Sequence, residues 1–361
     1  MEHISATAAI IGGGLIGCAI AAELASNGMR DIVVLEKEKH LGQHQSTRNS
    51  GVIHAGIYYQ PESLKARLCV EGNKILYAFC QQYDVPCKRT GKLVVATNAG
   101  EISSLEQILA VAEANGVTGV RMLASREIPP IEPYVQGSAA LYVPSTGIVD
   151  AATLLQRVRN TAAANGVEFL TSAKVDYIDS VDGLQLQTSR GEIRVDFLIN
   201  SAGVYAAEVA RMVNPTIIYQ TTPIKCEYAR INRPGIAQCC VYPVPSQETL
   251  GIHCTPTFDS SYLIGPSSTP VDEREEYGID HVPLDKFYQS IVKFMPAIRR
   301  EDLRKDPHCG VLAKLRNCHD FIIAKDAKYA NCIHLLGIDS PGLTASLAIA
   351  KYVVSLLADK K

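Results

Sequence analysis

The 361-residue chain contains no tryptophan, and aromatic residues make up only 6% of its composition. It also lacks an apolar run of the roughly 18–20 residues that a membrane-spanning helix needs. The apolar segment 6–25 is broken by consecutive glycines and has no basic region before it, which argues against a secretory signal peptide. We therefore expect a cytoplasmic protein, with a mitochondrial location or peripheral contact with a membrane as alternatives.

Neither sign of charge dominates, since 35 lysines and arginines face 37 aspartates and glutamates and the net charge is -2. This balance gives no electrostatic reason to expect a nucleic-acid partner. The 11 cysteines are an odd number, and they form no CxxC pair and no Cys/His pattern with metal-ligand spacing. No metal site is therefore predicted, and so many unpatterned thiols favour a reducing compartment.

The N-terminal segment has the pattern of a βαβ unit. Residues 8–11 and 32–35 are short apolar runs of the kind that form buried parallel strands. Residues 15–27 between them are rich in alanine, leucine and isoleucine, and Gly28 is a natural helix end. A strand, a helix and a second strand at this spacing predict a right-handed βαβ unit.

Gly12, Gly14 and Gly17 form a GxGxxG pattern at the turn between the first strand and the helix. In such a turn the first glycine allows a tight bend, the second lets a pyrophosphate approach the backbone, and the third lets helix and strand pack closely. The pyrophosphate then lies at the helix N-terminus, where free N–H groups favour an anion. Glu36, after the second strand, would accept hydrogen bonds from ribose hydroxyls. The pattern predicts dinucleotide binding without choosing between NAD and FAD.

The rest of the chain has α/β patterns at both ends and a β-rich region, 216–264, between them. Asp150 is predicted to cap the N-terminus of a helix that follows it. Segments with helical spacing are 63–83, 102–115, 150–164, 284–294 and 343–357, and apolar segments typical of strands are 93–97, 167–170, 197–200 and 333–336. The pattern predicts a split nucleotide-binding domain and a β-rich substrate domain.

Residues 43–59 read Gln-His-Gln-Ser-Thr-Arg-Asn-Ser-Gly-Val-Ile-His-Ala-Gly-Ile-Tyr-Tyr, and this segment resembles one family closely. It is similar to the L-2-hydroxyglutarate dehydrogenase/oxidase group of the D-amino-acid-oxidase-like (DAO) flavoprotein superfamily. Segments similar to the same group follow in order at 63–72, 144–150, 242–245, 251–256 and 340–348. The resemblance implies an α/β fold with a Rossmann-like FAD-binding domain and a β-rich, mixed-sheet substrate domain.

The resemblance also implies a division of the chain and a set of cofactor contacts. The FAD-binding domain would comprise 1–60, 150–212 and 305–361, and the substrate domain 61–149 and 213–304. FAD is expected to bind non-covalently, with the N-terminus of the last helix directed at the flavin pyrimidine edge, where negative charge develops on reduction. The implied cofactor residues beyond Gly12, Gly14, Gly17 and Glu36 are His44, Ser46, Thr47, Asn49, Ser50, Gly51, Gly203, Gly337, Ser340, Gly342, Leu343 and Thr344.

Oxidation of a 2-hydroxy acid needs a base for the hydroxyl proton, a hydride acceptor, and donors or cations that hold the carboxylate. Histidine suits the base, because its pKa lies near working pH. His54 and His253 both lie in segments that match the family, and the sequence does not decide which of them is the base. The expected substrate-binding residues are Tyr59, Lys225, Tyr228 and Lys314.

Two residues depart from the family pattern. Leu312 stands where many DAO-like relatives have an arginine near the substrate, and Cys226 stands where the group usually has glycine. Lys314 or Arg316 would have to supply the missing charge, although lysine lacks the bidentate fork of arginine. The identity of the substrate is the expectation that these departures affect most.

The function expected from the resemblance is FAD-dependent oxidation of an L-2-hydroxy acid, with L-2-hydroxyglutarate converted to 2-oxoglutarate. The electron acceptor would be a quinone, a redox protein or oxygen. Alternatives with the same fold are a glycerol-3-phosphate dehydrogenase-like enzyme, a glycine or amino-acid oxidase-like enzyme, and a non-catalytic flavin-binding protein. NAD as sole cofactor is disfavoured because a second complete GxGxxG pattern is absent.

Overall fold

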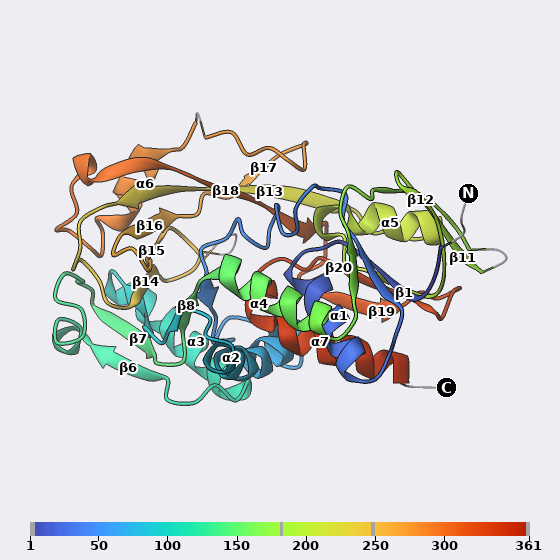
Figure 1. Cartoon of the computed structure of the whole chain (residues 1–361). Coiled ribbons are helices and arrows are strands. Elements are labelled where there is room, and N and C mark those ends of the chain that lie inside the picture. The colour runs from blue at the N-terminus through green and yellow to red at the C-terminus, as the bar shows by residue number, and fades with distance from the viewer. Residues whose placement is uncertain (1–3, 181–182, 247–249, 280, 359–361) are drawn as a thin grey trace.

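Two large β-sheets and a small three-stranded sheet organise the chain (Figure 1). They belong to a computed structural model that describes residues 4–180, 183–246, 250–279 and 281–358. The first large sheet has eight strands and the second has nine. Figure 1 shows most strands of the two large sheets at opposite ends of the molecule.

The predicted βαβ unit is present as β1 (Ile4–Ile11), α1 (Leu15–Ser26) and β2 (Ile32–Leu35). The two strands are parallel, with Ala8 opposite Ile32. All four residues of β2 are buried, as the continuous apolar run predicts for a strand covered on both faces.

The first sheet continues the parallel arrangement. Its strands β20, β12, β1, β2 and β9 lie side by side in this order and are all parallel. Three further strands are antiparallel: β19 pairs with β20, and β10 and β11 extend the sheet from β12. The bounds are β9 (Glu168–Leu170), β10 (Val175–Asp179), β11 (Leu184–Thr188), β12 (Gly191–Asn200), β19 (Ile322–Lys325) and β20 (Cys332–Leu336).

Alternate residues of β1 enter two different cores. Ala8 and Ile10 pack with helices α1, α2, α4 and α7, whereas Ala9 and Ile11 pack on the side of helix α5. Successive side chains of a strand point to opposite faces, so both faces of the sheet are covered by helices. Figure 1 shows α1, α4 and α7 on one side and α5 on the other. The bounds are α2 (Leu64–Gln82), α4 (Ala151–Ala164), α5 (Ala206–Val213) and α7 (Gly342–Ala358).

Side chains cap two of these helices. Asp150 Oδ1 accepts a hydrogen bond from Thr153 N at 2.7 Å, which confirms the predicted N-cap of α4. Ser63 Oγ accepts from Ala66 N at 3.1 Å at the start of α2. Among the described residues, no helix is both long enough and apolar enough to cross a membrane.

The second sheet is mixed and supplies the β-rich region. Its order is β17-β13-β16-β15-β14-β5-β7-β6, with β18 also paired to β13, and β14 with β5 is its parallel pair. Leu93 and Val95 face α6, while Val94 and Ala96 face α3. The bounds are β5 (Lys92–Ala96), β6 (Arg121–Ala124), β7 (Ala139–Val143), β13 (Thr221–Ile231), β14 (Cys240–Pro243), β15 (His253–Pro256), β16 (Tyr262–Gly265), β17 (Thr269–Pro270), β18 (Leu303–Leu315), α3 (Ile102–Ala114) and α6 (Leu284–Ile291).

The third sheet is short, and one of its strands lies directly before His54 in the chain. Its strands β3 (Val52–Ile53), β8 (Gly147–Val149) and β4 (Cys87–Lys88) pair antiparallel in this order. His54 follows β3 directly, so the pairing of β3 with β8 fixes the backbone that carries this histidine.

Two elements lie outside the predicted domain division. β18 pairs with β13 from Leu303 to Leu315, although the FAD-binding domain was predicted to resume at residue 305. Helix α2 packs in the core of the first sheet, although 61–149 was predicted for the substrate domain. The pairing of β18 and the packing of α2 show that distant partners, rather than local pattern, decide which core an element joins, and the domain division stays a prediction.

Candidate active site

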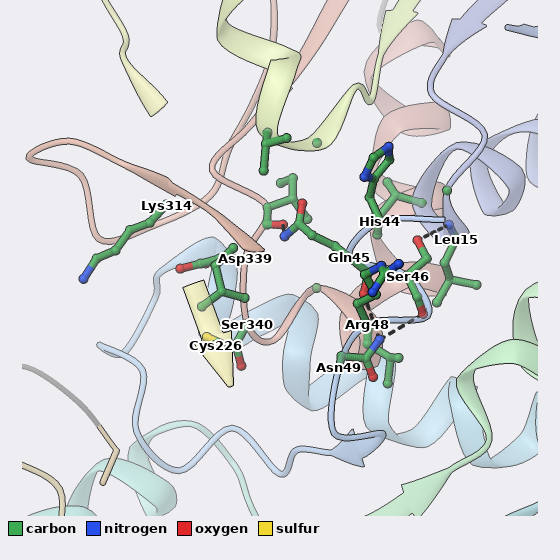
Figure 2. A pocket seen from close by; sticks show the side chains of 18 of the residues that line it. Leu15, His44, Gln45, Ser46, Arg48, Asn49, Cys226, Lys314, Asp339 and Ser340 are labelled. Atoms are coloured by element: carbon green, nitrogen blue, oxygen red, sulfur yellow. Dashed lines mark hydrogen bonds between the residues drawn. The ribbon is translucent and has the colours of Figure 1, made fainter. Parts of the chain in front are cut away.

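A cavity of about 860 Å³ extends from the glycine-rich turn after β1 to residues of the second sheet. Figure 2 shows His44, Ser46, Arg48 and Asn49 gathered on one side of it and Lys314 at the other end. A cavity of this size, lined by a few polar groups among apolar ones, is typical of a cofactor site.

The glycine-rich turn forms one end of the cavity. Gly12 has φ +106°, and a Cβ on it would lie 2.5 Å from Ser201 O. Both the backbone conformation and this overlap disfavour any side chain at the position. A Cβ on Gly17 would overlap the Gly12 carbonyl oxygen, which accounts for the close packing of helix on strand. A Cβ on Gly14 would meet only Ser46 Oγ, at 2.8 Å. Gly12 and Gly14 line the cavity, and Gly17 does not.

Glu36 lies beside this turn and is 7% exposed. One carboxylate oxygen accepts from Gly13 N at 2.9 Å, and the other accepts from Glu38 N at 2.9 Å. Glu36 also lines the cavity. Two backbone donors thus fix the carboxylate, whose remaining lone pairs are available to ligand hydroxyls.

The loop that carries the family-like segment crosses the cavity wall. Ser46 Oγ accepts from Leu15 N at 2.8 Å, which ties the loop to the start of α1 (Figure 2). Asn49 Nδ2 donates to Ser46 O at 2.9 Å, and Asn49 Oδ1 accepts from Gly51 N at 2.9 Å. Ser46, Asn49, Ser50 and Gly51 line the cavity. Thr47 does not line it, because its hydroxyl is turned to Gly42 O at 2.7 Å.

His44 is held at the edge of the cavity by two partners. Its Nδ1 lies 2.6 Å from Tyr277 Oη, and its Nε2 lies 3.1 Å from Glu38 Oε1. The guanidinium of Arg48 lies 4.1 Å from the centroid of the same Tyr277 ring. Arg48 lines the cavity and was not among the predicted site residues, since nothing in the local pattern distinguishes it from a solvated arginine.

The N-terminus of α7 forms another part of the wall. Ser340, Gly342 and Leu343 line the cavity, as does Gly203 in the turn after β12. Gly337 and Thr344 do not line it. Gly337 supplies a turn with φ +70°, and Thr344 Oγ1 accepts from His54 N at 2.9 Å. Both of these residues hold the wall in place rather than form it.

His54 lies on the cavity next to the start of α7. Its Nε2 is 3.3 Å from Ser340 Oγ, and its carbonyl oxygen accepts from Asn73 Nδ2 at 2.9 Å. Burial, and to a smaller extent the charge of Lys92, lower the pKa of His54 to about 3. The imidazole is therefore neutral at physiological pH, the form that accepts a proton.

His253 reaches the same cavity from β15. Its ring stacks on that of Tyr242, with centroids 3.7 Å apart and planes inclined by 25°. Its Nδ1 is buried and has no hydrogen-bond partner in the described part of the chain. Burial holds its pKa well below the usual value, and the charge of Lys92 and the neighbouring His54 act in the same direction.

Three of the four predicted substrate-binding residues line the cavity: Tyr59, Tyr228 and Lys314. Lys225 does not. Its ammonium group pairs with Glu276 at 3.0 Å and lies 3.8 Å from Glu227, so the predicted substrate contact has no support there.

Both departures from the family pattern face the cavity. Leu312 and Cys226 line it, and Lys314 follows Leu312 at the next residue on the same face of β18. Arg316 lies beyond the end of β18, is exposed and does not line the cavity. Cys226 is buried, and burial raises the pKa of its thiol to about 12.

The residues present fit a dinucleotide with a flavin. The absence of a side chain at Gly12 and Gly14, the N-terminus of α1 and Glu36 would together suit a pyrophosphate and a ribose. The N-terminus of α7 lies at the same cavity as the two neutral histidines. Sequence reasoning missed Tyr58 and Tyr242, which also line the cavity; they lie within family-like segments but carry no signal of their own.

Comparisons with known proteins agree with this geometry. The family described as FAD dependent oxidoreductase (DAO) matches residues 7–356. A mitochondrial L-2-hydroxyglutarate dehydrogenase of Caenorhabditis elegans is 32% identical over 397 residues, which cover 96% of this chain and 92% of the relative. An L-2-hydroxyglutarate dehydrogenase of Indibacter alkaliphilus is 30% identical, with 94% of this chain and 96% of the relative covered.

Among solved structures, the L-alpha-glycerophosphate oxidase of Mycoplasma pneumoniae with FAD bound is similar over the whole chain. The TM-score is 0.91 at 27% sequence identity, and 100% of this chain and 96% of that chain are covered. The predicted α/β fold and the predicted family are thereby confirmed.

Proposed function

The chain belongs to the DAO family of FAD-dependent oxidoreductases, and we propose that it oxidises L-2-hydroxyglutarate to 2-oxoglutarate with non-covalently bound FAD. The observation that carries the proposal is the pair of neutral histidines, His54 and His253, on a cavity that begins at the dinucleotide-binding turn. Relatives named L-2-hydroxyglutarate dehydrogenase that align over nearly the whole chain support the choice of substrate.

FAD, when bound, supplies the hydride acceptor. Its pyrophosphate would be held at Gly12 and Gly14 by the N-terminus of α1, and a ribose by Glu36. The remaining contacts are assigned to the wall residues His44, Ser46, Asn49, Ser50, Gly51, Gly203, Ser340, Gly342 and Leu343. Gly17, Thr47, Gly337 and Thr344 support this wall from behind.

The protein's own part in the reaction is to take the proton of the substrate hydroxyl. A neutral imidazole is needed for this step, and burial keeps both His54 and His253 in that form. His253 offers an Nδ1 with no hydrogen-bond partner among the residues that the structure describes, while His54 Nε2 lies near the Ser340 hydroxyl. Either ring is a candidate base, and the other would orient the hydroxyl.

The substrate carboxylate next to the hydroxyl needs donors at the same wall. Lys314 provides a cation, and Tyr59 and Tyr228 provide phenol groups. Burial raises the pKa of both phenols above the usual value, so they remain protonated donors. Lys314 stands two residues from Leu312, and we assign to it the positive charge that holds this carboxylate.

A substrate panel tests the proposal. The purified enzyme is mixed with L-2-hydroxyglutarate, L-lactate, sn-glycerol 3-phosphate or glycine, with a redox dye as acceptor, and the keto product is identified by mass spectrometry. Formation of 2-oxoglutarate at the highest kcat/KM supports the proposal. Preference for glycerol 3-phosphate would favour the second candidate, a glycerophosphate oxidase, which the 0.91 TM-score to that enzyme supports.

The same assay extends to the electron acceptor. We infer a quinone, a redox protein or oxygen, and parallel measurements with a soluble quinone and with oxygen alone separate them. Several relatives carry mitochondrial names, so a mitochondrial location is proposed beside a cytoplasmic one. Cell fractionation with a tagged chain distinguishes the two.

A further inference from the structure

A lysine without a charged partner is buried behind the cavity wall. Lys92, the first residue of β5, is 1% exposed, and its ammonium group forms no ion pair within the described part of the chain. A charge removed from water is costly unless it is paired. Burial lowers the pKa of Lys92 to about 8, so the group still carries its charge near neutral pH.

Aromatic rings surround this ammonium group. Nζ lies 4.0 Å from the centroid of the Tyr242 ring and 5.0 Å from that of the Tyr58 ring. Both distances are within the ~6 Å at which a ring face attracts a cation. Tyr58 and Tyr242 line the cavity, whereas Lys92 does not. The positive charge therefore lies behind two residues of the wall.

Three polar atoms of the same wall have no hydrogen-bond partner among the described residues. They are Tyr58 Oη, Tyr242 Oη and His253 Nδ1. Buried polar atoms are nearly always hydrogen-bonded, so three unpartnered atoms at one wall indicate that a ligand completes them. A positive charge beside a phenol makes its O–H a better donor, because it stabilises negative charge on the oxygen. The ligand group favoured here is an anion.

We propose that Lys92, Tyr58 and Tyr242 form an anion subsite for the second carboxylate of a dicarboxylic hydroxy acid, the one distant from the reacting hydroxyl. Lys92 is a positioning residue that acts through the two rings, and the phenol O–H groups donate to the carboxylate. The subsite rests on the proposed function, from which it takes the dicarboxylate. It also provides positive charge behind a cavity wall that includes the apolar Leu312.

The test compares two lysine variants of the FAD-loaded protein. Lys92→Met removes the charge and keeps most of the stem, and Lys88→Met is the control, because Lys88 is exposed and does not line the cavity. Each protein is titrated with glutarate and with butyrate, and the change in flavin absorbance gives Kd. Lys92→Met is expected to raise the Kd of glutarate by about ten- to fiftyfold and that of butyrate by less than about threefold. Lys88→Met should change neither.

An unchanged glutarate Kd in Lys92→Met, or an equal rise for glutarate and butyrate, would overturn the subsite. If Lys92→Met does not fold, the double variant Tyr58→Phe/Tyr242→Phe removes only the two hydroxyls and should raise the glutarate Kd at least about tenfold; no rise would overturn the proposal equally. A wild-type protein that prefers glutarate through Lys92 but is not reduced by L-2-hydroxyglutarate would refute the proposed function and leave the subsite standing.

Discussion

Replacing Gly17 with alanine tests how closely helix α1 packs on the dinucleotide-binding turn. In an open helix this change would stabilise the protein by about 1 kcal/mol, because alanine is the better helix former. Here the added Cβ overlaps the backbone oxygen of Gly12, far inside the 3.4 Å at which ordinary contact begins. Backbone cannot swing away as a side chain can, so helix and strand must separate by more than about an ångström.

The overlap decides whether Gly17→Ala stabilises or destabilises the protein. Overpacking of a tight core costs about 1–3 kcal/mol, and occasionally more. Because the overlap falls on rigid backbone, the cost lies at the upper end of this range, about 3 kcal/mol, and after the gain of about 1 kcal/mol in helix propensity Gly17→Ala should destabilise the protein by about 2 kcal/mol and lower Tm by a few degrees. Because Gly12 lines the cavity, the displaced turn should also hold FAD less well.

Gly14→Ala is the matched control. Gly14 has φ -79°, which alanine adopts readily, and its Cβ would meet only Ser46 Oγ. This variant should lose FAD on purification, because Gly14 lines the cavity, while the apoprotein should unfold within about 1 °C of the wild-type apoprotein. The ratio of flavin absorbance to protein absorbance measures FAD retention. Thermal unfolding of both apoproteins measures the change in stability. A Gly17→Ala protein with wild-type Tm and full flavin content would refute the packing argument.

Four further results follow from the site. His54→Ala and His253→Ala should both retain FAD. In the variant that lacks the base, flavin reduction measured by stopped flow should be slower by about 10²–10⁴-fold. Wild-type reduction rates in both variants would exclude both histidines as the base. Since the pKa of His54 is lowered to about 3 and burial holds that of His253 well below 6.5, flavin reduction should show no acid limb near pH 6.5; an acid limb near 6.5 would contradict this. Lys92 loses its charge as pH rises through about 8, so the glutarate Kd should rise there in the wild type and stay flat in Lys92→Met. Lys314→Ala should raise KM by about two- to fivefold, whereas Arg316→Ala, outside the cavity, should leave it unchanged; equal effects would remove Lys314 from the site.

The N-terminal fold was predictable because its signals are local. The four apolar residues 32–35 form β2 with the predicted bounds, and Asp150 caps α4 as its position before a helical pattern indicates. β18 was not predictable in the same way. Its partner β13 ends more than 70 residues earlier in the chain, and no local pattern records that pairing.

The cavity residues also divide into those that a local pattern predicts and those that distant contacts decide. Ser46, Asn49 and Ser50 lie in a loop whose glycines and short polar side chains indicate a ligand contact, and all three line the cavity. Lys225 looks equally suited to hold a carboxylate, but Glu276 neutralises it from a segment 51 residues away. Lys92 is the opposite case. A lysine at the start of a strand is ordinarily exposed, so the sequence gives no sign that this one is buried. Only the packing of Tyr58 and Tyr242 around it reveals a buried charge.

Anaerobic titration of the purified protein with L-2-hydroxyglutarate, with the D-enantiomer as control, tests the central claim most directly. We expect the L-form to bleach the oxidised flavin band stoichiometrically and the D-form to leave it unchanged, because the proposed base and carboxylate donors line a single chiral cavity. A yellow protein that neither enantiomer bleaches would contradict the proposed substrate. The chain would then be an FAD-dependent oxidoreductase that acts on another electron donor.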